Sequence, residues 1–524
     1  MKHLLPGTFA SLAFLTAAPL LAQLEFGGRP YGLDRSVHGL PEPPVAVMPV
    51  VDPAPLLAED EARLANGNKG PYRYGVVHAT DLGLDNSGSW TVLSNGDRVW
   101  QLGIECPAAF SIDMVFTTYV VPEGARVYVH TPNGEHLGAF TAASNGGFTQ
   151  MGVAPMTGDR ITIEYVEPAS VAGQGDLRIG EVIHAYRDIM GTTKGLNDSG
   201  ACNNNVICPE GDPWRDQIRS VALISGGGGL CTGQLMNNCA QDETPYFLTA
   251  NHCVQGGINP ATAIYRFRWE SPTCTPTQNA PTNKTISGAQ QLATNAGSDM
   301  AFLQLNSSPQ DSWEVFYTGW NKGTTAATSV TAIHHPSGDI KKISFEEQPV
   351  TSGSYGGAQC WKVAAWDDGT TEGGSSGSGL WDQNGLLVGQ LYGGQANCNF
   401  NFNDYYGKFN VSFPFLEQWL GDCGTTLPGL DPATVSVAEL DEAAAIGLAP
   451  NPTTGTVLVT LPALGDGTAV LRLTDALGRV VAERNVARGT ERLTLDLGGQ
   501  ADGLYLVDLR QNDRRVVQRL LLER

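Results

Sequence analysis

Residues 373–379 read G-G-S-S-G-S-G and contain the serines best placed for nucleophilic chemistry. Glycine permits backbone conformations that bulkier residues avoid, so a serine between glycines can be presented to a substrate carbonyl. The neighbouring backbone N–H groups can then face a developing oxyanion. Runs of glycine and serine are also typical of flexible loops. Because a serine hydroxyl needs a base to activate it, the histidines decide between these interpretations.

The chain has 9 histidines, and none of them follows Ser376. The pattern G-x-S-x-G around Ser375 is the nucleophile elbow of the α/β-hydrolases, whose histidine must come after the serine. That fold is therefore excluded, and the order His, Asp, Ser is available instead. The nearest preceding histidines are His252, His334 and His335.

An apolar, strand-like run at residues 246–250 leads to His252, and a cysteine follows that histidine directly. Asp299 stands at the mouth of a second apolar run, residues 300–305. A half-buried carboxylate is costly unless it accepts hydrogen bonds, for example from an imidazole N–H. His334 and His335 have no such setting and are expected to be structural.

Three motifs together form a specific pattern: T-A-x-H-C at residues 249–253, S-D-x-A-x-L-x-L at 298–305 and G-S-S-G-S at 374–378. The pattern resembles the chymotrypsin-type serine proteases, and most closely the bacterial lysyl endopeptidases. The likeness covers about residues 195–423 with every motif in the family's order.

The resemblance implies that His252 is the general base, that Asp299 orients it and that Ser376 is the nucleophile. The backbone N–H groups of Gly374 and Ser376 would form the oxyanion hole. Ser375 is then only a neighbour of the nucleophile. Most chymotrypsin-like enzymes carry an aspartate there, which pairs with the new N-terminus on activation, so no such charge-pair switch is expected here.

The same resemblance implies a lysine-binding pocket with Asp404 at its floor and Trp366 at its border. Gly393 and Gly394 would leave its mouth open, and Tyr392 stands where the family has a histidine. A buried, charge-assisted pair with a substrate ammonium discriminates strongly against neutral side chains. We therefore expect a secreted serine endopeptidase that cleaves after lysine. Arginyl or mixed specificity, and a non-catalytic surface adhesin on a protease fold, remain as alternatives.

Lysine usage gives an independent indication of the same specificity. Lys194 precedes Gly195 just ahead of the protease-like region, where a lysyl endopeptidase could release its own pro-segment. No lysine follows Lys408, although the rest of the chain is rich in arginine.

Composition indicates an exported protein. Residues 1–22 carry Lys2 and then an apolar run, as a signal peptide does. The net charge of −21 argues against nucleic-acid partners, which need basic patches. Ten cysteines without a C-x-x-C pair favour disulfides over a zinc site, and no metal or cofactor is expected. The resemblance implies three disulfides: Cys202–Cys398, Cys208–Cys274 and Cys231–Cys253. The pairing of four cysteines stays open: Cys106, Cys239, Cys360 and Cys423.

The tail contains P-N-P at residues 450–452, D-x-x-G-R at 475–479 and G-x-Y at 503–505. Together these resemble the C-terminal sorting domain of type IX secretion cargo; a plain Ig-like module is the alternative. The resemblance implies passage across the outer membrane through the type IX machinery, to the cell surface or beyond. Protein and peptide substrates and a monomeric state are expected.

Short apolar strands separated by turns predict an all-β chain. Its parts are a double six-stranded β-barrel of the chymotrypsin type, a β-sandwich-like pro-domain and a small C-terminal β-sandwich. The expected divisions are a signal peptide at 1–22, a pro-segment at 23–194 with an extended leader (23–70) and a β-rich part (71–190), the protease domain at 195–423, a linker at 424–445 and the sorting domain at 446–524.

Overall fold

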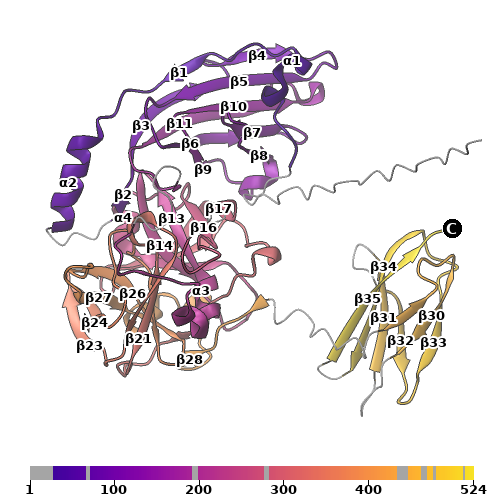
Figure 1. Ribbon diagram of the computed structural model, residues 1–524. Helices are drawn as coiled ribbons and strands as arrows, with labels where there is room; N and C mark the ends of the chain where they lie inside the picture. Colours follow the sequence, from indigo (N-terminus) through magenta and orange to yellow (C-terminus); the bar gives the residue numbers. More distant parts are fainter. Residues whose placement is uncertain are drawn as a thin grey trace, which may run out of the picture. The chain divides into compact units, whose positions relative to one another are not determined.

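The computed structural model describes residues 27–65, 71–191, 199–276, 282–432, 446–461, 469–475, 480–511 and 514–524. The chain is built mainly of β-strands, which confirms the all-β class (Figure 1). It divides into two compact units, Met1–Leu430 and Asp431–Arg524. The expected signal peptide, the bond after Lys194 and most of the linker lie outside the described residues. Within those residues no helix combines the length and apolar character needed to cross a membrane.

The first barrel is a sheet in the order β17-β16-β13-β14-β15-β19-β18. Its strands are β13 (Val221–Gly226), β14 (Gly229–Leu235), β15 (Tyr246–Ala250), β16 (Ile264–Phe267), β17 (Thr285–Ser287), β18 (Ala289–Asn295) and β19 (Met300–Leu305). The two edge strands, β17 and β18, flank a single residue, Gly288, whose φ is +76°. They are one strand bent at a corner that glycine permits. Because its halves pair with β16 and β19, the sheet closes into six strands.

The second barrel follows the order β22-β21-β25-β26-β27-β24-β23. Its strands are β21 (Val330–His334), β22 (Lys342–Glu346), β23 (Thr351–Tyr355), β24 (Ala358–Ala365), β25 (Gly379–Asp382), β26 (Leu387–Gly394) and β27 (Phe402–Lys408). The edge strands β22 and β23 are again consecutive in the chain, joined by residues 347–350, and they stand at the two ends of this strand order. The short strand β12 (Asn204–Asn205) pairs with β22.

The barrels pack against each other through an apolar cluster that includes Leu248 and Phe302 of the first barrel and Ile333 of the second. The helical segment after β27 supplies further members. It comprises α5 (Phe409–Ser412), η7 (Phe413–Phe415) and α6 (Glu417–Leu420).

The body of this unit continues past the expected boundary at residue 423. Strand β28 (Thr426–Leu427) pairs with β20 (Trp320–Asn321), and Leu430 bridges to Tyr317.

The N-terminal region, for which we keep the expected name pro-domain, is a sandwich of two mainly antiparallel sheets. One sheet contains β1 (Val45–Val47), β4 (Ser89–Val92), β5 (Arg98–Glu105), β7 (Arg126–His130), β8 (His136–Phe140) and β10 (Arg160–Glu167). The other contains β3 (Gly75–Gly83), β6 (Ser111–Val120), β9 (Met151–Thr157) and β11 (Asp176–Ala185). Trp100 and Ile163 of the first sheet share one buried core with Phe116 and Leu177 of the second.

The expected extended leader, residues 23–70, is not extended throughout. Strand β1 joins the first sheet beside β5, and helices η1 (Tyr31–Asp34), α1 (Arg35–His38) and α2 (Pro53–Ala65) form within the leader.

The pro-domain and the first barrel are joined by strand pairing and by a common apolar cluster. Strand β2 (Tyr72–Arg73) pairs with the start of β14, with Tyr72 opposite Leu230. The Tyr74 N–H donates to the carbonyl of Gly228 at 2.8 Å. Tyr74 is fully buried in a cluster with Leu230 and Trp269 of the protease body.

The C-terminal unit is the predicted small sandwich. One sheet holds β29 (Gly447–Ala449), β30 (Thr456–Thr460) and β33 (Arg492–Asp496), and the other holds β31 (Ala469–Asp475), β32 (Val480–Val486), β34 (Gly503–Gln511) and β35 (Arg514–Leu522). Val457 and Leu495 of the first sheet meet Leu471 and Val507 of the second in one core.

The structure contains the three disulfides that the resemblance implies, and a fourth that the sequence left open. The pairs are Cys202–Cys398, Cys208–Cys274, Cys231–Cys253 and Cys239–Cys423. Cys106 and Cys360 are buried free thiols.

Buried Asp113 on β6 generates a prediction about pH. Tyr74 donates its hydroxyl to Asp113 Oδ2 at 2.7 Å, and burial raises the pKa of Asp113 to about 7. Between about pH 4 and 7 the folded state keeps a proton that the unfolded chain has lost, so this group's contribution to stability is lost as pH rises. We expect Asp113→Asn to gain up to about 4 kcal/mol relative to the native protein over that range, measured by urea unfolding.

Asp176→Asn, which changes an exposed carboxylate on β11, is the matched control. A similar pH-dependent gain in that variant would contradict burial of Asp113 as the cause.

Candidate active site

His252 is positioned by the register of two strands. In the pairing of β15 with β19, Ala250 lies opposite Met300, so the residues just after β15 meet the residue just before β19. The short helix α4 (Asn251–Gln255) begins there, and the N–H of Asn251 donates to the Asp299 carbonyl at 2.9 Å. The histidine and the aspartate are thus brought together by the first barrel alone.

The Asp299 carboxylate is occupied on both oxygens. Oδ2 lies 2.7 Å from His252 Nδ1, and Oδ1 accepts the backbone N–H of His252 at 2.9 Å. These bonds satisfy a side chain that is only 4% exposed. Asp299 has φ +51°, a conformation that aspartate tolerates better than most residues. With Nδ1 bonded to a carboxylate, Nε2 is the ring nitrogen left to act as a base.

Ser376 lies beside this pair and is fully buried. Its carbonyl accepts the N–H of Thr232 at 2.8 Å, which ties it to β14. The sulfur of Cys253 lies 3.7 Å from that carbonyl and 4.0 Å from His252 Nε2. The serine backbone and the imidazole therefore flank one disulfide, Cys231–Cys253, although they lie 124 positions apart in the chain.

The same disulfide explains a grouping that resembles a metal site. Ligand atoms of Cys231, His252 and Cys253 all lie within 4.8 Å of one another. Both sulfurs are already bonded to each other, so neither is available as a thiolate.

The glycine before the serines is oriented by its neighbours. The carbonyl of Gly373 accepts the N–H of Ser337 at 2.6 Å, and because a peptide group is planar and trans, the N–H of Gly374 points the opposite way. The carbonyl of Gly374 accepts the hydroxyl of Thr232 at 2.9 Å. Gly374 has φ +91°, which few residues other than glycine adopt.

The next turn orients the second N–H in the same manner. The carbonyl of Ser375 accepts the N–H of Ser378 at 3.0 Å, so the N–H of Ser376 points away from it. The N–H of Ser375 itself donates to the carbonyl of Glu372 at 3.1 Å. The two N–H groups predicted for the oxyanion hole thus lie on peptides whose carbonyls are held elsewhere.

Asp404 is fully buried near the start of the second barrel's strand β27. Its Oδ2 accepts hydrogen bonds from Trp366 Nε1 at 2.9 Å and from the Thr371 hydroxyl at 2.6 Å. The N–H of Ala396 reaches Oδ1 at 3.4 Å. A side chain at Gly394 would collide with Oδ1, so glycine is needed for this approach. The structure therefore groups three of the predicted pocket residues.

Tyr392 and Gly393 follow on β26. The Tyr392 ring stacks on His252, with centroids 5.5 Å apart and planes inclined by 21°. Tyr355 meets Tyr392 edge-on at 5.1 Å and stacks on Tyr405 at 4.9 Å. Burial raises the pKa of Tyr392, which favours its neutral form. Gly393 lies at an irregularity in the β26–β27 pairing, opposite Tyr405.

Several residues of this neighbourhood were missed from the sequence. Thr232, Tyr355 and Thr371 carry no spacing signal that distinguishes them from other strand or loop residues. His334, which we expected to be structural, lies 2.8 Å through Nδ1 from the Ser375 hydroxyl.

The pro-domain reaches this region through β2. A side chain at Gly374 would stand 3.4 Å from Tyr72 Cβ. Pro71 approaches Gly229 of β14 and Gly256 just after α4, where added side chains would stand 3.0 Å and 2.9 Å away. The β2 segment therefore lies beside the serine loop.

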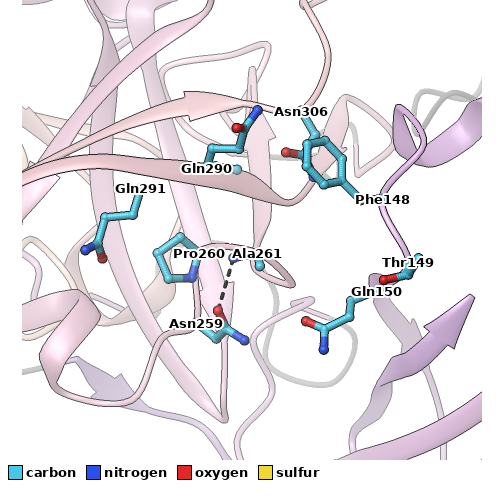
Figure 2. A pocket seen from close by; sticks show the side chains of 10 residues that line it. Phe148, Thr149, Gln150, Asn259, Pro260, Ala261, Gln290, Gln291 and Asn306 are labelled. Carbon is cyan, nitrogen blue, oxygen red and sulfur yellow. Dashed lines mark hydrogen bonds between the residues drawn. The ribbon is translucent and has the colours of Figure 1, made fainter.

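A separate cavity of about 420 Å³ lies between the pro-domain and the first barrel (Figure 2). Phe148, Thr149 and Gln150 line it from the pro-domain, and residues including Asn259 and Asn306 line it from the barrel. None of the predicted site residues contributes to its walls.

Two parts of the chain match known families. Residues 196–407 match the family model of the lysyl endopeptidase C-terminal domain, and residues 448–523 match that of the secretion system C-terminal sorting domain. The chain is 31% identical over 286 residues to a lysyl endopeptidase of Pseudomonas aeruginosa. That alignment covers 50% of this chain and 61% of the relative. The match to the sorting domain makes this a secreted or cell-surface protein.

Solved structures of serine proteases are also similar. A Glu endopeptidase is 18% identical with a TM-score of 0.29, covering 43% of this chain and 99% of its own. A thermostable serine protease from an extremophilic microorganism is 14% identical with a TM-score of 0.30, covering 39% and 97%.

Gly377 generates a prediction about how tightly the serine loop is packed. Its φ is +85°, and an added Cβ would collide with the Thr249 hydroxyl and the Thr232 carbonyl. Gly357 has nearly the same φ, +88°, but nothing lies within 4 Å of an added Cβ. Alanine at either position costs about 1–2 kcal/mol in backbone strain, and at Gly377 overpacking adds about 1–3 kcal/mol.

We therefore expect Gly377→Ala to have a clearly lower midpoint of thermal unfolding than the matched Gly357→Ala variant. Equal midpoints for the two variants would contradict the crowding at Gly377.

Proposed function

We propose that this protein is an exported serine endopeptidase that cleaves peptide bonds after lysine. The observation that carries the proposal is the bond of 2.7 Å between His252 Nδ1 and Asp299 Oδ2, beside a serine loop whose carbonyls from Gly373 to Ser376 are hydrogen-bonded elsewhere. The lysyl endopeptidase match over residues 196–407 supports the same activity.

In the proposed reaction the hydroxyl of Ser376 attacks the backbone carbonyl carbon of the substrate lysine. His252 takes the hydroxyl proton through Nε2, while Asp299 holds the ring in the required tautomer. The N–H groups of Gly374 and Ser376 stabilise the oxyanion, and each such donor contributes about 3 kcal/mol in related proteases. His252 then protonates the leaving amine, and water repeats the sequence on the acyl-enzyme.

Specificity for lysine would come from Asp404. Its carboxylate is fully buried, and bonds from Trp366 and Thr371 fix its orientation. A buried anion held in this way favours a substrate ammonium and rejects neutral side chains, because these leave the carboxylate uncompensated. Tyr392, Gly393 and Gly394 would form the wall next to the scissile bond.

We further propose that the type IX secretion machinery exports the protein and recognises its C-terminal unit. Autocatalytic cleavage between Lys194 and Gly195 would then release the pro-segment from a monomeric protease. The match of residues 448–523 to a sorting domain supports the first step.

The activity is tested on processed protein with lysyl, arginyl and glutamyl anilides. We expect hydrolysis of the lysyl substrate, and loss of at least about 10⁴-fold in kcat for Ser376→Ala because the acyl-enzyme cannot form. A fluorophosphonate should label Ser376 in the native protein and still label the Ser375→Ala variant. Preferred hydrolysis of the arginyl or glutamyl substrate would refute the lysine assignment, and absence of labelling would refute the serine mechanism.

The role of Asp404 is tested with Asp404→Asn, which keeps the shape of the side chain and acceptors for Trp366 and Thr371. Loss of the buried charge should lower kcat/KM for the lysyl anilide by about 10²- to 10³-fold. Labelling by a small fluorophosphonate that does not enter the pocket should continue at the native rate. An unchanged kcat/KM would place the lysine-binding charge elsewhere.

A further inference from the structure

A buried histidine that the proposed mechanism does not use lies directly behind the serine loop. His334 ends strand β21 and is fully buried. Its Nδ1 lies 2.8 Å from the hydroxyl of Ser375, and its Nε2 lies 3.1 Å from the hydroxyl of Ser344. Ser375 is the residue between the two backbone N–H groups proposed for the oxyanion hole.

The carbonyl of Thr370 at the end of this chain of hydrogen bonds determines which group donates in each bond. Ser344 donates its hydroxyl to the carbonyl of Thr370 at 2.7 Å, so its oxygen receives the Nε2–H of His334. In the neutral ring Nδ1 is then an acceptor, and the Ser375 hydroxyl must donate to it. The oxygen of Ser375 in turn accepts the N–H of Glu372 at 3.1 Å.

This chain of bonds fixes the side chain of Ser375 from two sides. The backbone N–H of the same residue donates to the carbonyl of Glu372, so side chain and main chain together close a tight turn. Rotation of that turn would swing the peptide that carries the N–H of Ser376. A displacement of about 1 Å in a catalytic group can cost about 10²-fold in rate.

We infer that His334 is a positioning residue, which holds Ser375 so that the N–H groups of Gly374 and Ser376 face the reacting carbonyl oxygen. This inference rests on the proposed serine endopeptidase function. His334 touches neither the substrate nor the reacting atoms. It acts through the hydroxyl of Ser375, and its effect is confined to the transition state, where the oxyanion develops.

Two substitutions separate positioning from packing. His334→Asn places an amide near the former Nδ1 and keeps a partner for Ser375, whereas His334→Gln reaches the former Nε2 and keeps a partner for Ser344. Both remove the same imidazole from the core. On processed protein we expect the Gln variant to lose about 10- to 100-fold in kcat for the lysyl anilide with KM within about twofold. The Asn variant should keep kcat within about threefold of native.

Two further variants trace the effect to the serine. Ser375→Ala should reproduce the loss of the Gln variant, and the double variant with His334→Gln should be no slower than either single one, because both break one link. A lysyl aldehyde, whose hemiacetal oxygen occupies the oxyanion hole, should bind the Gln variant more weakly in proportion to kcat. Binding of n-butylamine, which fills only the lysine pocket, should be unchanged.

Equal losses of kcat in the Asn and Gln variants, or additive losses in the double variant, would overturn the positioning role. The rate of fluorophosphonate labelling separates this failure from that of the proposed function. A native protein that is not labelled refutes both, whereas a native protein and a Gln variant labelled at equal rates refute only the role of His334.

Discussion

The candidate site depends above all on one buried carboxylate having all its hydrogen bonds. The Asp299 carboxylate accepts hydrogen bonds from the ring and from the backbone N–H of His252. Its backbone carbonyl accepts the N–H of Asn251, the first residue of α4. Removing a carboxylate from water is costly, and these donors offset the cost only while β15 and β19 keep their register. A slip of one residue would turn each side chain to the opposite face of the sheet. The stability of the first barrel and the orientation of the imidazole therefore both depend on the register of β15 and β19.

The serine loop relies on a different kind of support. Its carbonyls accept hydrogen bonds from hydroxyl and backbone N–H groups of both barrels. Thr232 of the first barrel bonds the Gly374 carbonyl, and Ser337 of the second bonds the Gly373 carbonyl. The loop thus depends on correct docking of the two barrels, which the shared apolar cluster around Phe302 and Ile333 provides.

Local patterns predicted much of this fold. The apolar runs that end near His252 and begin after Asp299 are strands β15 and β19, and the glycines at 374 and 377 do occupy positive φ. Alternation of apolar residues and turns predicted the sandwiches at both ends of the chain. Such patterns involve only a few neighbouring residues, so they can be recognised without knowledge of the fold.

What the sequence did not predict depends on contacts between distant segments. The disulfide Cys239–Cys423 joins residues 184 positions apart, and the sequence around each cysteine does not indicate which cysteine it pairs with. The position of Tyr355 against Tyr392 follows from the closure of the second barrel. His334 looked like a structural histidine because its partner Ser375 lies on a loop 41 positions further along the chain. Helix α2 was missed because its prolines suggested an extended chain, although they stand in its first turn, where proline is tolerated.

The apolar cluster that contains Tyr74, Leu230 and Trp269 has a consequence for the life of the molecule after export. The proposed cleavage after Lys194 would remove the covalent link between the N-terminal sandwich and the barrels but would leave this common interior intact. Separation would wet side chains that are now dry, including an indole and a phenol ring, at about 25 cal/mol for every Å² uncovered. If the chain is cut after Lys194 as proposed, dissociation of the N-terminal sandwich is a separate step, whose rate depends on this shared apolar cluster.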